Sequence, residues 1–296
     1  MTKSIDHYLA QLRDELAGVD QAIIQDALAD SEDHLRAALV YLQQSEPDLS
    51  MEQALARVID DYGSPAEVAD GYRQVEARMP IPLAPTLPGK ETPSLFQSFF
   101  GAFVDPRAYA SFFYMCFSFI TGILYFTWAV TGVSLAVGLA VLIIGLPFIV
   151  TFLLSIRGIA LVEGRIIEAL LGVRMPSRPL FSQNHLGIWD RLKALFSDTR
   201  AWTTLLYMVL QLPLGTLYFS LCISLFSVGF SFIAAPFLQV LWDEPLIHFY
   251  GYELWMPLWA FPFTFIFGAF VVLITLHLAR AIGKMHARYA KALLVR

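Results

Sequence analysis

Two stretches of this chain share one pattern of residues at a constant offset of 93 positions, and this repeat constrains the fold more than any other feature. Residues 105–126 read DPRAYASFFYMCFSFITGILYF, and residues 198–219 read DTRAWTTLLYMVLQLPLGTLYF. Each copy begins with an Asp-x-Arg step and continues for about twenty residues without a charged side chain, the length of a helix that crosses a bilayer. The repeat therefore predicts a duplicated membrane unit. The identical pairs are Asp105/Asp198, Arg107/Arg200, Ala108/Ala201, Tyr114/Tyr207, Met115/Met208, Gly122/Gly215, Leu124/Leu217, Tyr125/Tyr218 and Phe126/Phe219.

Charge divides the chain into two unlike parts. Residues 1–79 carry 16 acidic and 6 basic side chains, a net charge of −10, whereas residues 80–296 carry 9 acidic and 14 basic, a net charge of +5. The first part is polar and long enough to form a small domain, and the second is apolar enough to place about a hundred residues in lipid. A soluble enzyme is not expected, and the strong negative charge of the first part disfavours direct contact with nucleic acid.

The N-terminal residues predict four helices joined by short turns. Apolar residues recur at helical spacing from Ile5 to Leu16 and again after Asp20. Two capping boxes, Ser50 with Gln53 and Ser64 with Glu67, mark the starts of a third and a fourth helix. We expect residues 1–78 to form a compact four-helix domain.

This N-terminal region resembles the HAAS domain, a small helical signalling module associated with PadR-like regulators. The matching residues are Tyr8-Leu9-x-x-Leu12, Asp30-x-x-x-His34 and the turn Gly63-Ser64-Pro65-x-Glu67. The resemblance implies a cytoplasmic interaction module that binds a regulator of this kind through residues 1–78, and it implies no catalysis. His34 is interpreted as a packing residue.

The rest of the chain predicts a proline-rich linker and a four-span membrane domain. Residues 79–94 contain five prolines, which favour an extended spacer, and residues 95–296 form the membrane part. Basic residues follow the second and fourth spans, which predicts a bacterial inner-membrane protein with both termini in the cytoplasm. The fold class is all-α, with two pseudo-symmetric helical hairpins in the membrane. The predicted spans are about 111–131, 135–156, 202–225 and 258–278, with a turn at Gly132–Ser134 between the first two.

Residues 226–242 are the hardest part of the topology, because they are apolar and about as long as a short span. A fifth crossing would place the basic C-terminus outside, against the charge bias. We therefore expect four spans and an outer-face segment at 226–257, whose first part lies in the interface or re-enters the membrane. The choice among crossing, re-entry and interface stays open from the sequence.

The membrane part resembles the "putative sensor" domain of some bacterial histidine kinases and related proteins. The resemblance covers about residues 99–294 and rests on Gly145-Leu146-Pro147, Arg157-Gly158-x-Ala160, Glu163-x-Arg165 and Leu170-Leu171-Gly172. It implies a sensor domain and leaves the stimulus unspecified.

Polar and aromatic residues cluster in the outer-face segment, which makes it the candidate ligand site. The alternatives are an aromatic belt at headgroup depth, favoured by the many Trp and Tyr rings, and a site for an apolar or amphiphilic ligand. A metal site is disfavoured, because three potential ligands with neither a cysteine nor a second histidine form a weak pattern. Pro245 predicts a helix start that would place Glu244 and His248 one turn apart. The candidate residues are Trp242, Asp243, Glu244, His248, Tyr250, Tyr252 and Trp255.

Charged residues at the cytoplasmic ends of the spans form a second candidate group. The aspartates of the two Asp-x-Arg steps are expected to cap their helices, and the arginines to meet lipid phosphates. The alternative is a contact with the acidic N-terminal domain. His286 and its basic neighbours are expected on an interfacial helix. The residues of this group are Asp105, Arg107, Asp198, Arg200, Arg157 and Arg165.

No phosphate-binding loop, nucleophilic triad or cysteine cluster occurs in the sequence, so we expect no enzyme activity, no cofactor and no metal. The sequence favours a sensor that perceives a lipid, a hydrophobic ligand or envelope stress and signals through residues 1–78. A lipid or small-molecule carrier, a channel-like protein and a passive scaffold are the alternatives. Membrane lipid is an expected partner, and a homo-oligomer is compatible with the apolar helix faces.

Overall fold

The computed structural model divides the chain into two compact units, and each contains several helices. The first unit is drawn from residues 1–84, 135–205 and 290–296, and the second from residues 85–134 and 206–289. The predicted linker at 79–94 and Asp198 lie outside the described residues. The structure describes residues 4–78, 99–140, 142, 145–176, 197, 199–242, 245 and 247–295.

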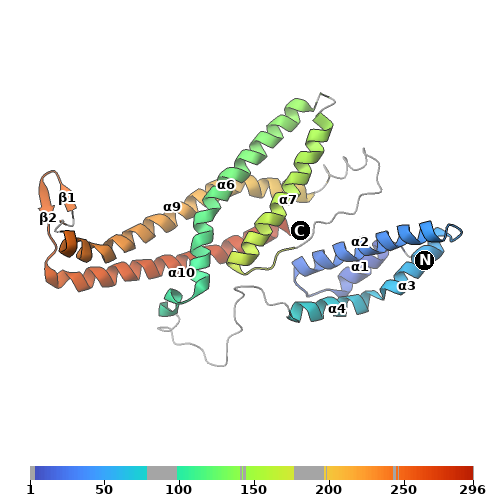
Figure 1. Cartoon of the computed structure of the whole chain (residues 1–296), viewed down its shortest axis with the longest axis horizontal. Coiled ribbons are helices and arrows are strands. Elements are labelled where there is room, and N and C mark those ends of the chain that lie inside the picture. Colours follow the sequence, from blue (N-terminus) through green and yellow to red (C-terminus); the bar gives the residue numbers. More distant parts are fainter. Residues whose placement is uncertain are drawn as a thin grey trace. The chain divides into compact units, whose positions relative to one another are not determined.

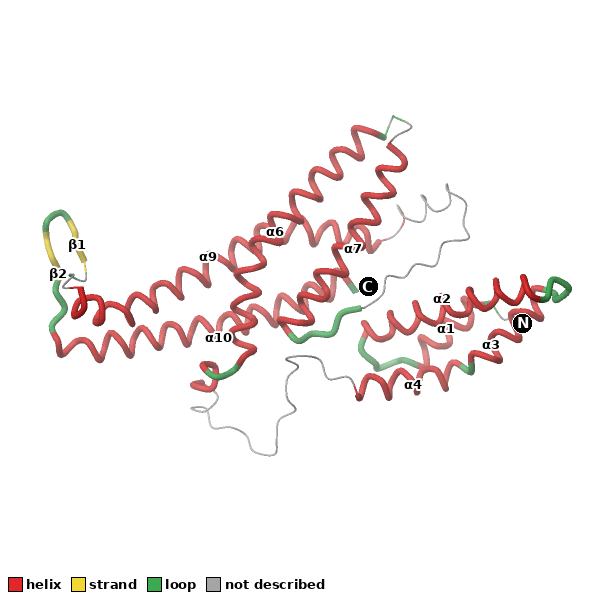
Figure 2. The backbone as a smooth tube through the Cα atoms, in the orientation of Figure 1, coloured by secondary structure: helices red, strands yellow, loops and turns green. Residues whose placement is uncertain are grey.

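Four helices form the N-terminal part of the first unit, as the sequence predicts (Figures 1 and 2). Both predicted capping boxes are present: the Ser50 hydroxyl accepts from the backbone N–H of Gln53, and the Ser64 N–H donates to Glu67 Oε2 at 2.9 Å. These contacts satisfy N–H groups that have no partner inside the helix. The helices are α1 (Ile5–Glu15), α2 (Gln21–Ser45), α3 (Met51–Tyr62) and α4 (Pro65–Arg78).

The core of these four helices is apolar and carries one tyrosine with a structural hydroxyl. Leu12, Leu16 and Leu35 are fully buried, and the Tyr8 hydroxyl donates to the carbonyl of Gly63 at 3.0 Å. The His34 ring stacks on the Tyr62 ring, with 4.8 Å between the ring centroids, which agrees with the interpretation of His34 as a packing residue. The four helices therefore share a core of their own.

Burial, followed by the negative charges of Tyr62 and Glu67, raises the pKa of Tyr8 to about 12. An unfolded tyrosine loses its proton near pH 10, so between about pH 10 and 12 the folded state holds a proton that the unfolded state has lost. We expect residues 1–78 to be stabilised by Tyr8 below pH 10 and to lose that contribution as the pH rises towards 12. Thermal melts by circular dichroism from pH 8 to 12 test this, and Tyr8→Phe should show a shallower decline. Parallel declines in the two proteins would contradict the assignment.

Three helices dominate the second unit, and a short hairpin connects the last two. α6 spans Pro106–Leu139, α9 spans Thr199–Trp242 and α10 spans Phe261–Leu294; the ends of these helices extend into the first unit, which also contains α7 (Gly145–Leu171). Figure 1 shows α9 and α10 running side by side in opposite directions. The hairpin strands are β1 (Ile247–Phe249) and β2 (Tyr252–Leu254), and the single-turn helices are η1 (Gly101–Phe103) and η2 (Leu258–Ala260).

The predicted turn at Gly132–Ser134 is wrong, because α6 continues through it to Leu139. A glycine and a serine lower helix propensity, but the Ser134 hydroxyl donates to the carbonyl of Val130 at 2.7 Å and so needs no turn to find a partner. In an apolar stretch, a continuous helix also satisfies every backbone group. The first long helix therefore ends later than the sequence indicates.

Residues 226–242 are not a separate element, because they continue α9 as one helix of 44 residues. Such a helix is about 66 Å long at 1.5 Å per residue, about twice the thickness of a bilayer's hydrocarbon core. Pro213 and Pro236 lie inside it. Proline removes one backbone donor and bends a helix, but in an apolar segment it does not have to end the helix.

The two repeat copies contact each other through equivalent glycines on α6 and α9. A Cβ on Gly122 would lie 2.7 Å from the carbonyl oxygen of Gln211, and a Cβ on Gly215 would overlap the carbonyl oxygen of Ser118. Ser118 and Gln211 are themselves equivalent positions in the repeat. The contact therefore has a local two-fold character, with each glycine receiving the backbone of the other copy.

Burial follows the same repeat. Equivalent positions in the two copies are buried together, so the copies use the same helix face to pack. These pairs are Ala108/Ala201, Ser111/Thr204, Tyr114/Tyr207, Met115/Met208, Ser118/Gln211 and Tyr125/Tyr218.

Candidate functional site

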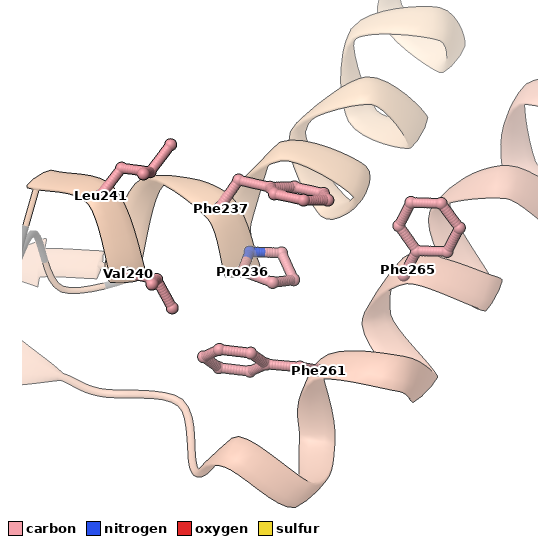
Figure 3. A pocket seen from close by; sticks show the side chains of 6 residues that line it. All are labelled: Pro236, Phe237, Val240, Leu241, Phe261 and Phe265. Carbon is pink, nitrogen blue, oxygen red and sulfur yellow. The ribbon is translucent and has the colours of Figure 1, made fainter.

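An open apolar groove of about 420 Å³ lies where α9 ends and α10 begins. This volume falls in the range of small-molecule sites. Figure 3 shows the rings of Phe237, Phe261 and Phe265 arranged around the ring of Pro236. Every lining residue is apolar, so the groove offers contact to hydrocarbon or aromatic groups and no charge. The lining consists of Pro236, Phe237, Val240, Leu241, Phe261 and Phe265.

Two hydrogen bonds tie the end of α9 to the segment that leads into α10. Gln239 Nε2 donates to the carbonyl of Met256 at 2.8 Å, and the Met256 N–H donates to Gln239 Oε1 at 2.9 Å. Met256 is buried. The side-chain amide of Gln239 therefore both donates to and accepts from the backbone of Met256. These two bonds hold the end of α9 against the segment before α10 and so position the walls of the groove.

The hairpin beyond the groove corrects the helix start predicted at Pro245. β1 and β2 pair antiparallel, with His248 opposite Glu253, so His248 lies on a strand instead of one helical turn from Glu244. Tyr250 and Gly251 have φ values of 48° and 85°, and two positive φ angles at a two-residue turn match the twist of a β-hairpin. The glycine after an aromatic run is the sequence signal for this turn.

Three of the predicted outer-face residues have described side chains, and these are exposed and do not line the groove. Trp242 is exposed at the end of α9, and Tyr250 is 91% exposed at the hairpin turn. Trp255 is exposed, and its Nε1 donates to Glu253 Oε2 at 3.3 Å. The backbone positions of His248 and Tyr252 are in β1 and β2, while Asp243 and Glu244 lie outside the described residues.

A second candidate site is a buried histidine among tyrosines, formed by α6, α9 and α10. His286 of α10 is fully buried, which corrects its expected place on an exposed interfacial face. Its Nε2 lies 2.8 Å from the Tyr114 hydroxyl of α6 and 3.1 Å from the Tyr207 hydroxyl of α9. The rings of Tyr218 and Tyr289 lie 5.6 and 5.7 Å from the imidazole. One histidine therefore contacts the same tyrosine from both repeat copies.

Several buried polar atoms around these helices have no hydrogen-bond partner among the described residues. They are the side-chain amide of Gln211, the Nδ1 of His286 and the hydroxyl of Tyr289. Tyr207 and Gln211 are four residues apart on α9, so they share one face of the helix. Such atoms are costly to bury, and they mark this cluster as more than ordinary apolar packing.

The first Asp-x-Arg step lies at the start of α6. Asp105 Oδ1 accepts from the backbone N–H of Arg107 at 3.0 Å, which is the expected capping contact, and its carboxylate pairs with Arg280 at 3.3 Å. Arg165 pairs with Glu168 at 2.7 Å on α7. Arg157 and Arg200 are half-buried on α7 and α9, and Asp198 lies outside the described residues.

Among the residues that the structure describes, no three histidine, cysteine, aspartate or glutamate side chains lie close enough to hold a metal ion. The apolar groove and the His286 cluster have different signals in the sequence. The sequence does not indicate which residues line the groove, because apolar residues fill the whole span. The repeated tyrosine, in contrast, was visible, but its partner His286 is 172 residues from Tyr114.

Four helices in the described residues are long and apolar enough to cross a membrane, as the sequence predicts, and together with their packing they define a helical membrane protein. They are Pro106–Leu139, Gly145–Leu171, Thr199–Trp242 and the stretch Leu258–Leu294. The family described as "Putative sensor" matches residues 114–294, more than half of the chain. The chain belongs to this family. No curated protein and no solved structure matches it.

Proposed function

We propose that this protein is a sensor of the bacterial inner membrane that perceives a lipid or another hydrophobic ligand in the groove between the ends of α9 and α10. The observation that carries the proposal is a groove of about 420 Å³ whose six lining residues are all apolar. Membership of the sensor family supports the same reading. The aromatic hairpin after α9 would then guide ligands that lie near the membrane surface.

In this proposal the N-terminal helices transmit the signal to a cytoplasmic partner. Residues 1–78 carry most of the acidic charge of the chain, and α1–α4 have a core of their own. Their resemblance to a HAAS domain supports a cytoplasmic interaction module that recruits a basic or PadR-like regulator. The basic residues after the second and fourth spans support a topology with both termini in the cytoplasm, and Arg157, Arg165 and Arg200 would contact lipid phosphates there.

Photolabelling of the full-length protein in lipid nanodiscs tests the groove. A palmitic acid that carries a diazirine should label peptides containing residues 236–241 and 261–265. Val240→Trp should fill the groove and reduce this labelling about tenfold, which corresponds to the loss of about 1.4 kcal/mol of apolar contact. The matched control is Val137→Trp on α6, where Val137 is 71% exposed and does not line the groove. Equal labelling of the two variants would argue against a groove ligand.

A carrier or channel-like protein is the alternative that the open apolar groove also supports. A carrier moves its ligand across the bilayer, whereas a sensor only has to bind it. Fluorescent fatty-acid flux into liposomes that contain the full-length protein separates the two, and the sensor reading expects the flux of protein-free liposomes. A passive scaffold would bind a cytoplasmic partner but would show neither labelling of the groove nor fatty-acid flux.

A further inference from the structure

His286 presents one ring nitrogen to two tyrosine hydroxyls. Tyr114 on α6 and Tyr207 on α9 lie 2.8 and 3.1 Å from the same Nε2 atom. An imidazole nitrogen has either one lone pair or one proton, whichever tautomer or protonation state is present. It can therefore make one full hydrogen bond at a time, although two hydroxyls are within reach.

We propose that His286 exchanges its hydrogen-bond partner between the two repeat copies. In one state of the protein Nε2 is hydrogen-bonded to Tyr114, and in the other to Tyr207. We call this histidine with its two tyrosines the selector. The two tyrosines are equivalent positions in the repeat, so the two states are similar in chemistry and differ in which helix holds α10. Both hydroxyls lie within hydrogen-bond distance of Nε2, and the contact with Tyr114 is the shorter one. Two nearly equal arrangements of one element are what a switch needs.

The hydrogen bonds of the buried imidazole are confined to one ring nitrogen among the described residues. The second ring nitrogen of a histidine is often held by a backbone carbonyl or a carboxylate. Here Nδ1 is buried and has no hydrogen-bond partner among the described residues. Tyr218 meets the ring edge-on, at an interplanar angle of 89°, and supplies packing. The Nε2 contacts are therefore the hydrogen bonds that distinguish one repeat copy from the other, while the tyrosine rings pack around the imidazole.

The glycine contact between the repeat copies supplies a pivot close to this selector. Gly122 lies eight residues after Tyr114, and Gly215 lies eight residues after Tyr207, about two helical turns in each copy. Backbone contact at the glycines fixes the separation of α6 and α9 at that level. A change in their crossing angle then moves the two tyrosines in opposite directions relative to α10, so a small tilt is enough to exchange the partner.

This inference does not depend on a groove ligand, but it would supply the transmission step of the proposed sensor. Both α9 and α10 continue from the His286 cluster to the groove. A ligand that shifts one of these helices along the other would change the distances at Nε2. Failure of the groove experiment would leave the selector intact, and failure of the selector would leave ligand binding intact.

Nuclear magnetic resonance of the full-length protein, labelled with ¹⁵N-histidine in detergent micelles, tests the selector. The chain has six histidines, and His286→Gln identifies the resonance of interest. We expect Tyr114→Phe and Tyr207→Phe each to retain a hydrogen-bonded Nε2 shift, because the remaining tyrosine takes over. The double variant should move Nε2 to the position of an unbonded nitrogen. Tyr218→Phe, which removes a hydroxyl from another ring beside His286, is the matched control and should leave the shift in place.

Thermal unfolding supplies an independent measurement that holds even if the double variant folds poorly. If His286 bonds one tyrosine at a time, each single variant should lower the melting temperature only slightly. The double variant should lower the melting temperature by more than the sum of the two single losses. Two outcomes would overturn the proposal. In one, a single Tyr→Phe variant alone reproduces the full shift of the double variant, so only one tyrosine bonds. In the other, the two single variants produce equal partial shifts and additive losses, so both bonds exist together.

Discussion

Gly215→Ala is expected to destabilise the membrane domain by about 1–3 kcal/mol or more, the usual cost of forcing an extra methyl group into a packed interface. The new Cβ would overlap the carbonyl oxygen of Ser118, and a carbonyl of a continuous helix cannot move aside alone. α6 and α9 would have to separate at the point where the repeat copies touch. The expected result is a lower melting temperature in detergent and an earlier loss of the monodisperse peak in size-exclusion chromatography.

Gly138→Ala is the matched control, because Gly138 lies on α6 with nothing within 4 Å of its Cβ position. Replacing an unobstructed helical glycine with alanine should leave stability unchanged or raise it by up to about 1 kcal/mol. Gly122→Ala should fall between the two, since its Cβ would lie 2.7 Å from the carbonyl oxygen of Gln211. If Gly215→Ala and Gly138→Ala melted at the same temperature, the backbone contact between the repeat copies would not exist.

Leu12→Ala is expected to lower the free energy of unfolding of the four N-terminal helices by about 2–5 kcal/mol, the range for truncating a fully buried leucine. Leu12 has no exposed surface and belongs to the cluster that joins α1 to the other three helices. Small domains are marginally stable, so a loss of this size should unfold much of the population at 37 °C. Chemical denaturation of residues 1–78, followed by circular dichroism, measures the change.

The same substitution tests the proposed output. In the full-length protein, Leu12→Ala should abolish the capture of a cytoplasmic partner in a mild-detergent pull-down and leave labelling of the groove unchanged. Val40→Ala is the control, because Val40 is 55% exposed and its truncation should change stability by no more than about 0.5 kcal/mol. Equal partner capture by the two variants would show that residues 1–78 do not carry the output.

The sequence predicted the elements whose signals are local. Helix starts at Ser50 and Ser64 were readable, because a capping box needs only residues three apart. The four long apolar helices were readable from the length of their charge-free runs. Helix ends were less well predicted inside those runs: α6 passes the expected turn at Gly132–Ser134, and α9 continues past residue 225 to Trp242. Glycine and proline do not interrupt a helix reliably where no water competes for the backbone.

The candidate sites depended on contacts that no local pattern contains. The outer-face candidates share an aromatic composition, but the described ones lie on different elements: Trp242 ends α9, Tyr250 is at the hairpin turn and Trp255 follows β2. The groove instead combines the end of α9 with the start of α10, where Phe261 follows Leu241 by 20 positions in the chain. An apolar residue that lines a groove and one that faces lipid are the same in sequence, so only the packing distinguishes them.

By itself, the sequence determined the repeated pattern, the four acidic N-terminal helices and the four apolar helices, because each follows from charge, periodicity or short spacing. The resemblance to a sensor family rested on short motifs in the membrane part. The tertiary structure alone decided that Gly122 and Gly215 pack reciprocally and that Tyr114 and Tyr207 meet at one histidine. The physical reason is the range of the interaction: helix formation and capping are settled within a few residues, whereas the choice of a buried partner depends on which faces the helices turn towards each other.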